Sequence, residues 1–159
     1  MAKSTLTGGD SLHKKLTEIA EKMGAGAVKV GFMAGATYPD GTPVPAVAFW
    51  NEYGTTKAPP RPFFRRMIAK ESGTWADKMA RLAVVTNYDG ARILALMGED
   101  VGAALQQSII ELSDPPLAQS TIDAKSFDKP LIDTGTMIRA ISYQVTDEEA
   151  VKIPYQGGA

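Results

Sequence analysis

The sequence predicts an α+β fold, in which a small antiparallel or mixed sheet of about three strands packs with several helices. Most of the chain repeats apolar residues at helical spacing, whereas residues 27–35 and the C-terminal segment alternate them as strands do. Hydrophobic residues make up 44% of 159 residues, which suffices for one core of ordinary size. We therefore expect a flexible N-terminal arm at residues 1–9 and a single α+β domain at residues 10–159.

The first elements are predicted to be a helix, a strand and a second helix. Apolar residues recur at helical spacing between residues 10 and 23, and Gly24 follows as a helix stop. Residues 27–35 predict a strand, one face of which carries Val28, Val30 and Phe32. For the short apolar segment 46–54 we expect a helix, and a strand is the alternative.

Long helices are predicted in the middle of the chain. Prolines keep residues 59–62 extended, and Pro62 suits the first turn of a helix that runs to about residue 85. A further helix is expected over residues 89–112. Its apolar stripe consists of Met97, Val101, Leu105, Ile109 and Leu112.

Two short helices and a hairpin are predicted for the C-terminal part. The helices are expected over residues 116–126 and 135–141, and Asp133 or Thr134 can cap the second one. The segments ISYQV and AVKIP flank four turn residues and predict a hairpin. We expect this hairpin to join the strand at 27–35 in one sheet.

The residues give no indication of an enzyme. The chain has no cysteine, which excludes a disulfide framework and a thiolate metal site. His13 is the only histidine, and without a partner it is expected to be structural. Asp147, Glu148 and Glu149 are interpreted as a solvated turn rather than a metal site. Phosphate-binding loops and nucleophile elbows are absent, so we expect no catalytic residue, metal or cofactor.

Charge and hydropathy indicate the compartment and the class of partner. The net charge of −1 argues against a general polyanion-binding protein. No apolar run approaches the roughly 20 residues that span a bilayer, and the N-terminus lacks a signal core. We therefore expect a chain that is made and kept in a cytoplasm and has no membrane partner.

Aromatic and cationic residues are densest in NEYGTTKAPPRPFFRRM, residues 51–67. Five cations and no acid lie between residues 57 and 70: Lys57, Arg61, Arg65, Arg66 and Lys70. Such a stretch can bind phosphate, form a solvated helix face or dock a protein. Docking is favoured because aromatics and arginine are enriched in interfaces, and prolines shape a loop before it binds. The expected interface residues are Glu52, Tyr53, Arg61, Pro62, Phe63, Arg65 and Arg66.

The two adjacent phenylalanines are expected to differ. A helical register joins Phe64 to Ile68 and Trp75, which places Phe64 in the core. Phe63 is then left for the docking surface. Glu52 is expected to pair with Arg61 or with a neighbouring subunit.

Two segments together resemble the small neck, or tail-completion, proteins of long-tailed bacteriophages. The first is VAFWNEYGTTKAPPRPFFRRM, with matching positions Glu52, Tyr53, Gly54, Thr55, Pro60, Arg61, Pro62 and Phe63. The second, DPPLAQSTIDAKSFDKPLIDTGTMIRAISYQV, is also similar to virion-morphogenesis proteins of Mu-like phages. Its matching positions are Leu117, Thr121, Ile122, Lys125, Pro130, Leu131, Ile132, Asp133, Thr134 and Gly135.

This resemblance implies a virion structural protein at the head–tail connector, in the neck or at the top of the tail. It implies a homo-oligomeric ring of six copies, or of twelve, that docks to a connector or stopper and to tail terminator or tail-tube proteins. Genomic DNA would only pass through the channel. The alternatives are a tail terminator that caps the tail tube and an accessory nucleic-acid-binding protein that uses residues 57–70.

Structural and interface roles are expected from the residue types and from charge. The residues expected to be structural are Gly54, Pro130, Asp133, Thr134 and Gly135. Residues 57–70 are basic and residues 128–159 are acidic on balance, so we expect these two regions to meet between neighbouring subunits or adjacent rings.

Overall fold

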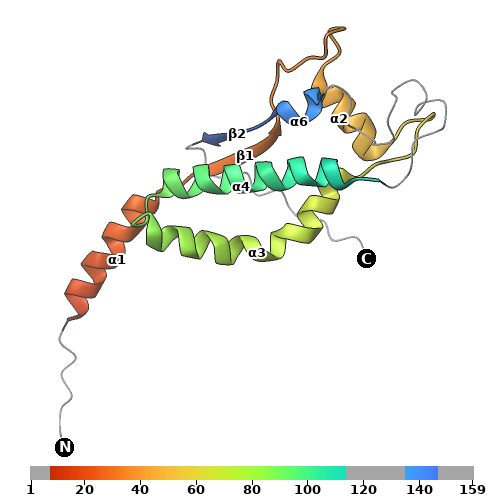
Figure 1. The fold of residues 1–159 in the computed structure, drawn as a ribbon. Helices are drawn as coiled ribbons and strands as arrows, with labels where there is room; N and C mark the ends of the chain where they lie inside the picture. The colour runs from red at the N-terminus through yellow and green to blue at the C-terminus, as the bar shows by residue number, and fades with distance from the viewer. Residues whose placement is uncertain (1–7, 114–134, 147–159) are drawn as a thin grey trace, which may run out of the picture.

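The structure is a computed structural model that describes residues 8–113 and 135–146 (Figure 1). Its elements, in chain order, are α1 (Gly9–Met23), β1 (Ala27–Phe32), α2 (Val44–Tyr53), α3 (Phe63–Val85), α4 (Gly90–Glu111), α6 (Thr136–Arg139) and β2 (Ile141–Thr146). Helices with an antiparallel sheet confirm the α+β class.

The sheet differs from the prediction in strand number. It has two strands, β1 and β2, and no third strand is seen in the described residues. The third strand was predicted at residues 150–154, which lie outside the described ranges, as do the predicted helix at 116–126 and residues 1–7 of the arm predicted at 1–9. α1 begins at Gly9, one residue before the predicted start of the domain at residue 10.

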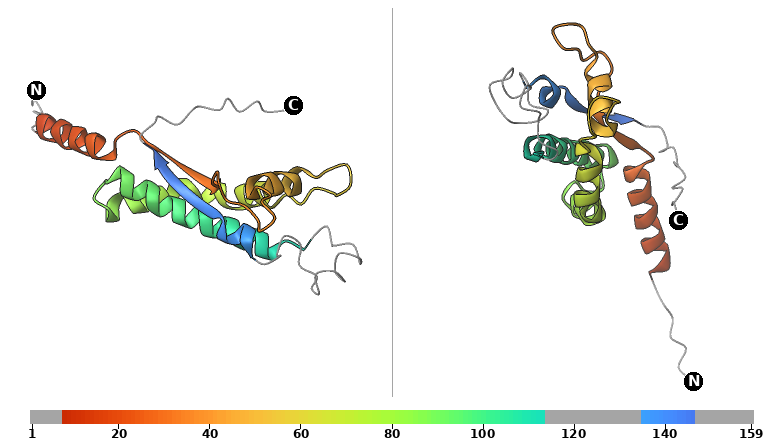
Figure 2. Two further views of the ribbon diagram at one scale, coloured as in Figure 1. Left: turned by 90° about the horizontal axis from the view of Figure 1, so that it is seen from above. Right: turned by 90° about the vertical axis from the view of Figure 1, so that its right-hand side faces the viewer.

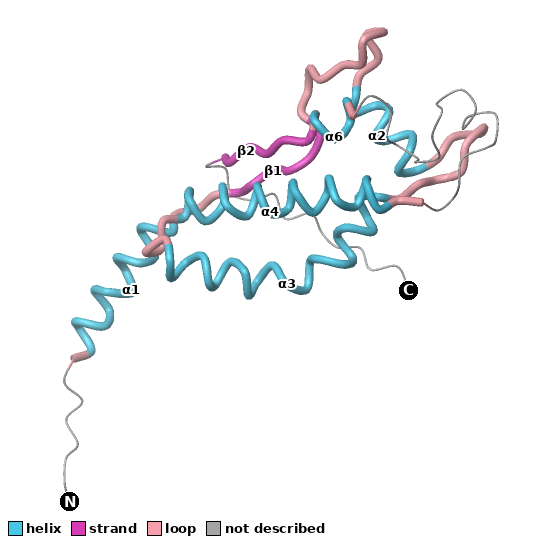
Figure 3. The backbone as a smooth tube through the Cα atoms, in the orientation of Figure 1, coloured by secondary structure: helices cyan, strands magenta, loops and turns pink. Residues whose placement is uncertain are grey.

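Helix α4 lies between α3 on one side and the sheet on the other (Figure 1). α3 and α4 run antiparallel as a helical hairpin, and the views in Figure 2 show the sheet crossing α4. α2 and α6 lie at one end of this layered body, and α1 extends away from the other end (Figures 1 and 2). Figure 3 shows the long loops that connect β1 to α2 and α2 to α3 at the α2 end.

Strand β1 pairs with β2 in a continuous antiparallel register that runs from Ala27 opposite Thr146 to Phe32 opposite Ile141. Val28, Val30 and Phe32, which were predicted to share one face, are half-buried and Lys29 is exposed, but Ala27 and Gly31 are half-buried as well, so burial does not alternate strictly along β1. The sheet covers α4 with its apolar face.

Two glycines of α4 face this sheet at different distances. A Cβ atom placed at Gly98 would lie 2.6 Å from Cδ2 of Tyr143 and 2.9 Å from Cγ2 of Val28, closer than such atoms approach. At Gly102 the nearest atom would be a methyl carbon of Ile141 at 3.8 Å, which is ordinary contact. The close approach of sheet and helix therefore requires glycine at position 98 and only tolerates it at position 102.

The main core lies where α2, α3, α4 and α6 meet. Its buried members are Val44, Ala48, Phe63, Met67, Leu105, Ile109, Leu112 and Met137. The apolar stripe predicted for the helix at 89–112 is confirmed, because Val101 is half-buried and the other four residues are buried. Asp89 begins α4 by accepting a hydrogen bond from the backbone N–H of Arg92 at 3.0 Å.

Helix α1 has no buried residue. It touches the body at its C-terminal end, where Gly90 of α4 packs directly against the carbonyl group of Met23. None of the helices in the described ranges is long and apolar enough to cross a membrane.

Candidate functional site: the junction of α2 and α3

The loop between α2 and α3 is folded compactly. Gly54 ends α2 with φ of +78°, in the left-handed region that favours glycine. The N–H of Thr55 donates to the carbonyl of Ala58 at 2.9 Å, and its hydroxyl accepts from the N–H groups of Lys57 and Ala58. A Cβ atom at Gly54 would lie 2.8 Å from the nitrogen of Pro60. These contacts bring the chain back to α2 and support the structural role expected for Gly54.

Helix α3 begins without a capping residue of its own. Pro62 occupies the N-cap position and has no side-chain oxygen to accept a hydrogen bond. Instead, Oε2 of Glu52 accepts from the N–H of Phe64 at 2.8 Å, and Oε1 accepts from the N–H of Arg65 at 3.1 Å. These are the second and third residues of the helix, whose N–H groups an N-cap side chain normally satisfies. Glu52 of α2 therefore caps α3 and places a negative charge at the positive end of its dipole.

Arg65 secures the same junction from the solvent side. Its Nε donates to Oε1 of Glu52 at 2.8 Å, and its Nη2 donates to the backbone carbonyl of Glu52 at 2.8 Å. The guanidinium group lies 5.0 Å from the centre of the Tyr53 ring, a cation–π distance. Glu52 is buried, whereas 56% of the Arg65 side chain is exposed. These contacts make Arg65 an ion partner of Glu52, a pairing that the sequence did not suggest.

The expected assignment of the two phenylalanines is wrong. Phe63 lies in the core with 1% of its surface exposed, while Phe64 is half-buried. The buried register of α3 runs from Phe63 to Met67, whereas Ile68 is 39% exposed. Phe63 also accepts a hydrogen bond on its carbonyl from the hydroxyl of Ser108 at 2.7 Å, which fixes it against α4. Phe63 is therefore a core residue and not a surface contact.

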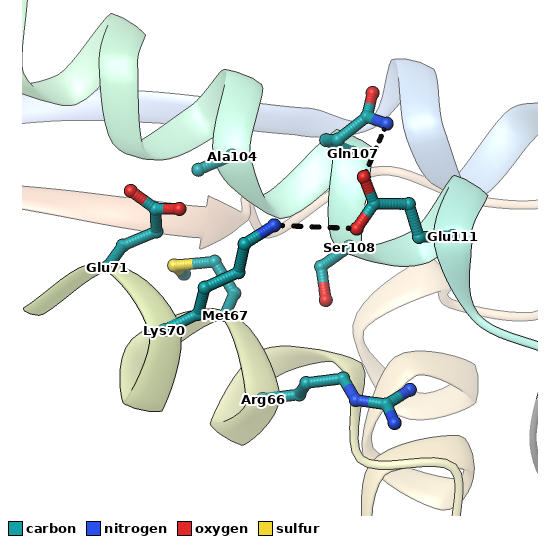
Figure 4. A pocket seen from close by; sticks show the side chains of 8 residues that line it. All are labelled: Arg66, Met67, Lys70, Glu71, Ala104, Gln107, Ser108 and Glu111. Atoms are coloured by element: carbon teal, nitrogen blue, oxygen red, sulfur yellow. Dashed lines mark hydrogen bonds and ion pairs between the residues drawn. The ribbon is translucent and has the colours of Figure 1, made fainter.

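The cations of residues 57–70 do not form one open basic face. Arg61 is buried at 9% exposure, Arg65 binds Glu52, and Lys70 lies 3.6 Å from Glu111 of α4 (Figure 4). The hydrogen bond from Gln107 and then the charge of Lys70 lower the pKa of the Glu111 carboxyl. Two of the five cations that suggested phosphate binding are thus matched by acids within the subunit, and a third, Arg61, is buried.

Exposed aromatic side chains gather on α2 beside this junction. Phe49 and Tyr53 are 60% and 57% exposed, and their ring centres lie 4.7 Å apart. They flank an open hollow of about 400 Å³ between α2 and α3, which we name the aromatic groove. Its apolar walls are Phe32, Phe49, Tyr53, Phe63, Phe64 and Ile68. Trp50, 49% exposed, follows Phe49 on α2 but does not line the groove.

Sequence reasoning missed Phe49, Trp50 and Ile68 as surface residues. The available signal was that residues 46–50 are all apolar and together go around the whole helix, so that a short helix at the surface cannot bury all of them. The exposed rings and the rim arginine suit contact with another protein, since aromatic residues and arginine are enriched in interface cores.

Some of the other expected site residues lie in the described ranges, and the rest lie outside them. Tyr53 and Arg66 are exposed, and Pro62 is half-buried. Gly135 is the N-cap of α6 with φ of +70°, which fits the structural role expected for it. Pro130, Asp133 and Thr134 lie outside the described residues.

No group of three or more histidine, cysteine or carboxylate side chains that could hold a metal occurs in the described ranges. What the junction offers is an apolar hollow with an ion-paired rim, built by the segment 51–67 together with α2. No family model, no curated protein and no solved structure matches this chain.

Proposed function

We propose that this chain is a structural protein of a bacteriophage virion, placed at the head–tail junction, which acts by docking to other protein subunits. The observation that carries the proposal is the aromatic groove, an apolar surface left open beside a rigid junction. A soluble monomer rarely leaves large aromatic side chains exposed side by side, and such a patch marks a binding surface.

The contacts of the junction explain what the residues of the phage-like segment VAFWNEYGTTKAPPRPFFRRM do in the fold. Glu52 caps α3, Gly54 permits the turn, and Phe63 anchors the start of α3 in the core. Together they fix α2 against α3 and hold the groove in one shape. In this proposal the motif builds the docking surface, while the contacting side chains are Phe49 and Tyr53 on α2. A preshaped surface binds with less loss of conformational entropy, as a repeated assembly contact requires.

The alternative of an accessory nucleic-acid-binding protein has less support. Phosphate binding needs cations that are free to neutralise phosphates, and Arg65 and Lys70 are matched by carboxylates of the same subunit. A tail terminator belongs to the same class as the proposal, since it would use the same docking surface at a different ring of the tail.

The proposal is tested by locating the protein in particles. We expect mass spectrometry of purified virions to detect the chain, and gold-labelled antibody to bind where head and tail meet. Deleting the gene should leave filled heads and finished tails unjoined. Absence of the chain from purified, infectious particles would refute the proposal.

A second measurement addresses the nucleic-acid alternative. We expect no submicromolar binding of duplex DNA in a gel shift at physiological salt. Binding that weakens steeply with salt and disappears in a Lys57→Ala/Arg66→Ala variant, which removes two exposed cations, would favour the alternative instead.

A further inference from the structure

We infer that α1 of one copy of this chain docks in the aromatic groove of a second copy. The inference deepens the proposed ring assembly and rests on it for the closure of the ring, but the pairwise contact can be measured on the purified protein. The contact would bring together two apolar surfaces, one on α1 and one in the aromatic groove, that the described part of the subunit leaves uncovered.

The first surface is the apolar stripe of α1. Leu12, Leu16, Ile19 and Met23 recur at a coiled-coil spacing, and Leu12 and Leu16 are 62% and 55% exposed. A helix of 15 residues without packing is marginal in water. Because α1 buries none of its residues in the described subunit, we expect its apolar stripe to pack against another molecule.

The second surface is the aromatic groove at the opposite end of the molecule. α1 and α2 lie at opposite ends of the α3–α4 hairpin in Figure 1 and in the left view of Figure 2. α1 therefore points away from the groove of its own subunit. A contact between two different patches on two copies is heterologous, and repeating it produces a ring or a filament.

Pairing of α1 with another α1 is the less suitable arrangement. The stripe covers fewer than two heptads, whereas a coiled coil needs about three to four. Lys15 and Lys22 both flank the stripe on one side, and His13 and Ala20 flank it on the other. Lys15 and Lys22 pair with Glu18 of their own helix, and the flanking positions of a second α1 would add no acid beside these lysines. A groove between two helices accepts a single amphipathic helix on a wider apolar surface.

The size of the contact predicts weak pairing and a stable closed assembly. Phe49 and Tyr53 are each more than half exposed and together offer roughly 200–300 Å². With a stripe of similar area on α1, one contact falls well below the about 1,200 Å² of a stable binary interface. In a closed ring each copy is held both by its α1 and by its groove, so the assembly is firmer than any pair.

Cross-linking in trans tests the contact, since the chain has no cysteine of its own. One preparation carries Leu16→Cys and the other carries Phe49→Cys, and the two are mixed at high concentration with a short bis-maleimide. We expect a cross-linked dimer that is several-fold more abundant than in mixtures that use Thr17→Cys or Trp50→Cys instead. Thr17 lies on the polar side of α1, and Trp50 does not line the groove.

Two results would overturn the inference. The first is a Leu16→Cys chain that cross-links mainly to itself, which would show α1–α1 pairing. The second is a yield for the designed pair that does not exceed the controls at any concentration. Detection in virions without this cross-link would refute the contact and leave the proposed function standing, and the reverse outcome would refute only the function.

Association measured by sedimentation gives an independent readout. Leu16→Glu should weaken self-association by about tenfold or more in Kd, because it places a charge in the centre of an apolar contact. Thr17→Glu adds the same charge to the polar side and should leave association unchanged. Since Leu16 is not buried in the subunit, both variants should keep the parent melting temperature, and equal effects on association would contradict the inference.

Discussion

Replacing Glu52 by alanine should be among the most damaging single changes at the α2–α3 junction. The change removes the acceptors of two backbone N–H groups, those of Phe64 and Arg65, at the start of α3. A fully buried donor without a partner costs about 1–3 kcal/mol, these two donors are partly buried, and losing a helix N-cap costs about 1 kcal/mol. Because these terms overlap, we expect the free energy of unfolding to fall by about 2–4 kcal/mol.

Equilibrium urea unfolding and calorimetry measure this loss. For a domain of this size the melting temperature should fall by roughly 5–15 °C. Arg65→Ala is the matched control because it removes the ion partner and leaves both capping hydrogen bonds in place. Since 56% of the Arg65 side chain is exposed, its pairing energy is screened and the control should lose about 1 kcal/mol or less.

Hydrogen exchange at single residues separates the effect of capping from that of ion pairing. In Glu52→Ala, hydrogen exchange should accelerate at the amides of Phe64 and Arg65, whereas Arg65→Ala should leave exchange at Phe64 unchanged. Glu52→Gln retains one acceptor oxygen and should lie between the parent and the alanine variant. If Arg65→Ala destabilised the protein as much as Glu52→Ala, the ion pair rather than the cap would hold the junction, and the argument would be refuted.

Three further predictions concern the core, the sheet and acid stability. Phe63→Ala should cost about 3–5 kcal/mol in urea unfolding, and Phe64→Ala less than half of that; equal losses would contradict the observed burial. Gly98→Ala should destabilise the fold by about 1–3 kcal/mol, whereas Gly102→Ala should be neutral or stabilising by up to about 1 kcal/mol through helix propensity. The lowered pKa of Glu111 contributes stability above its ordinary value of 4.5, and this is lost as the pH falls through the folded-state pKa. Glu111→Gln should therefore be less stable than the parent at neutral pH and equal to it in strong acid, and a difference that persists in acid would exclude this titration.

The long helices could be predicted because their signals are local. The expected range of 89–112 differs by one residue at each end from α4, Gly90–Glu111, since an Asp89 cap and a regular apolar stripe define it. A shared sheet for β1 and the C-terminal segment was also anticipated, and the structure shows that β2, the first strand of the predicted hairpin, is the strand that pairs with β1. These inferences needed only periodicity and capping residues.

The junction could not be predicted because it depends on tertiary geometry. A helical register that starts at Phe63 and one that starts at Phe64 both give a plausible apolar face of α3. The packing of α3 against α4 determines that Phe63 and Met67 are the buried residues. Glu52 caps a helix that begins after a loop, and no local spacing rule signals such a contact. The aromatic groove exists only once α2 is fixed against α3, so the sequence pointed to the segment without indicating which side chains stay exposed.

The pairing of β1 with β2 has a consequence for synthesis of the chain. Ala27 and Thr146 are hydrogen-bonded neighbours although 119 residues separate them. At the usual translation rate of about 5–20 residues per second, β1 leaves the ribosome on the order of ten seconds before its partner strand exists. A lone strand with Val28 and Val30 exposed is prone to aggregate, and α4 is the first complete element that can shield it. Truncations that end between α4 and β2 should therefore yield a nascent chain that depends on chaperones, and restoring residues up to Thr146 should release it.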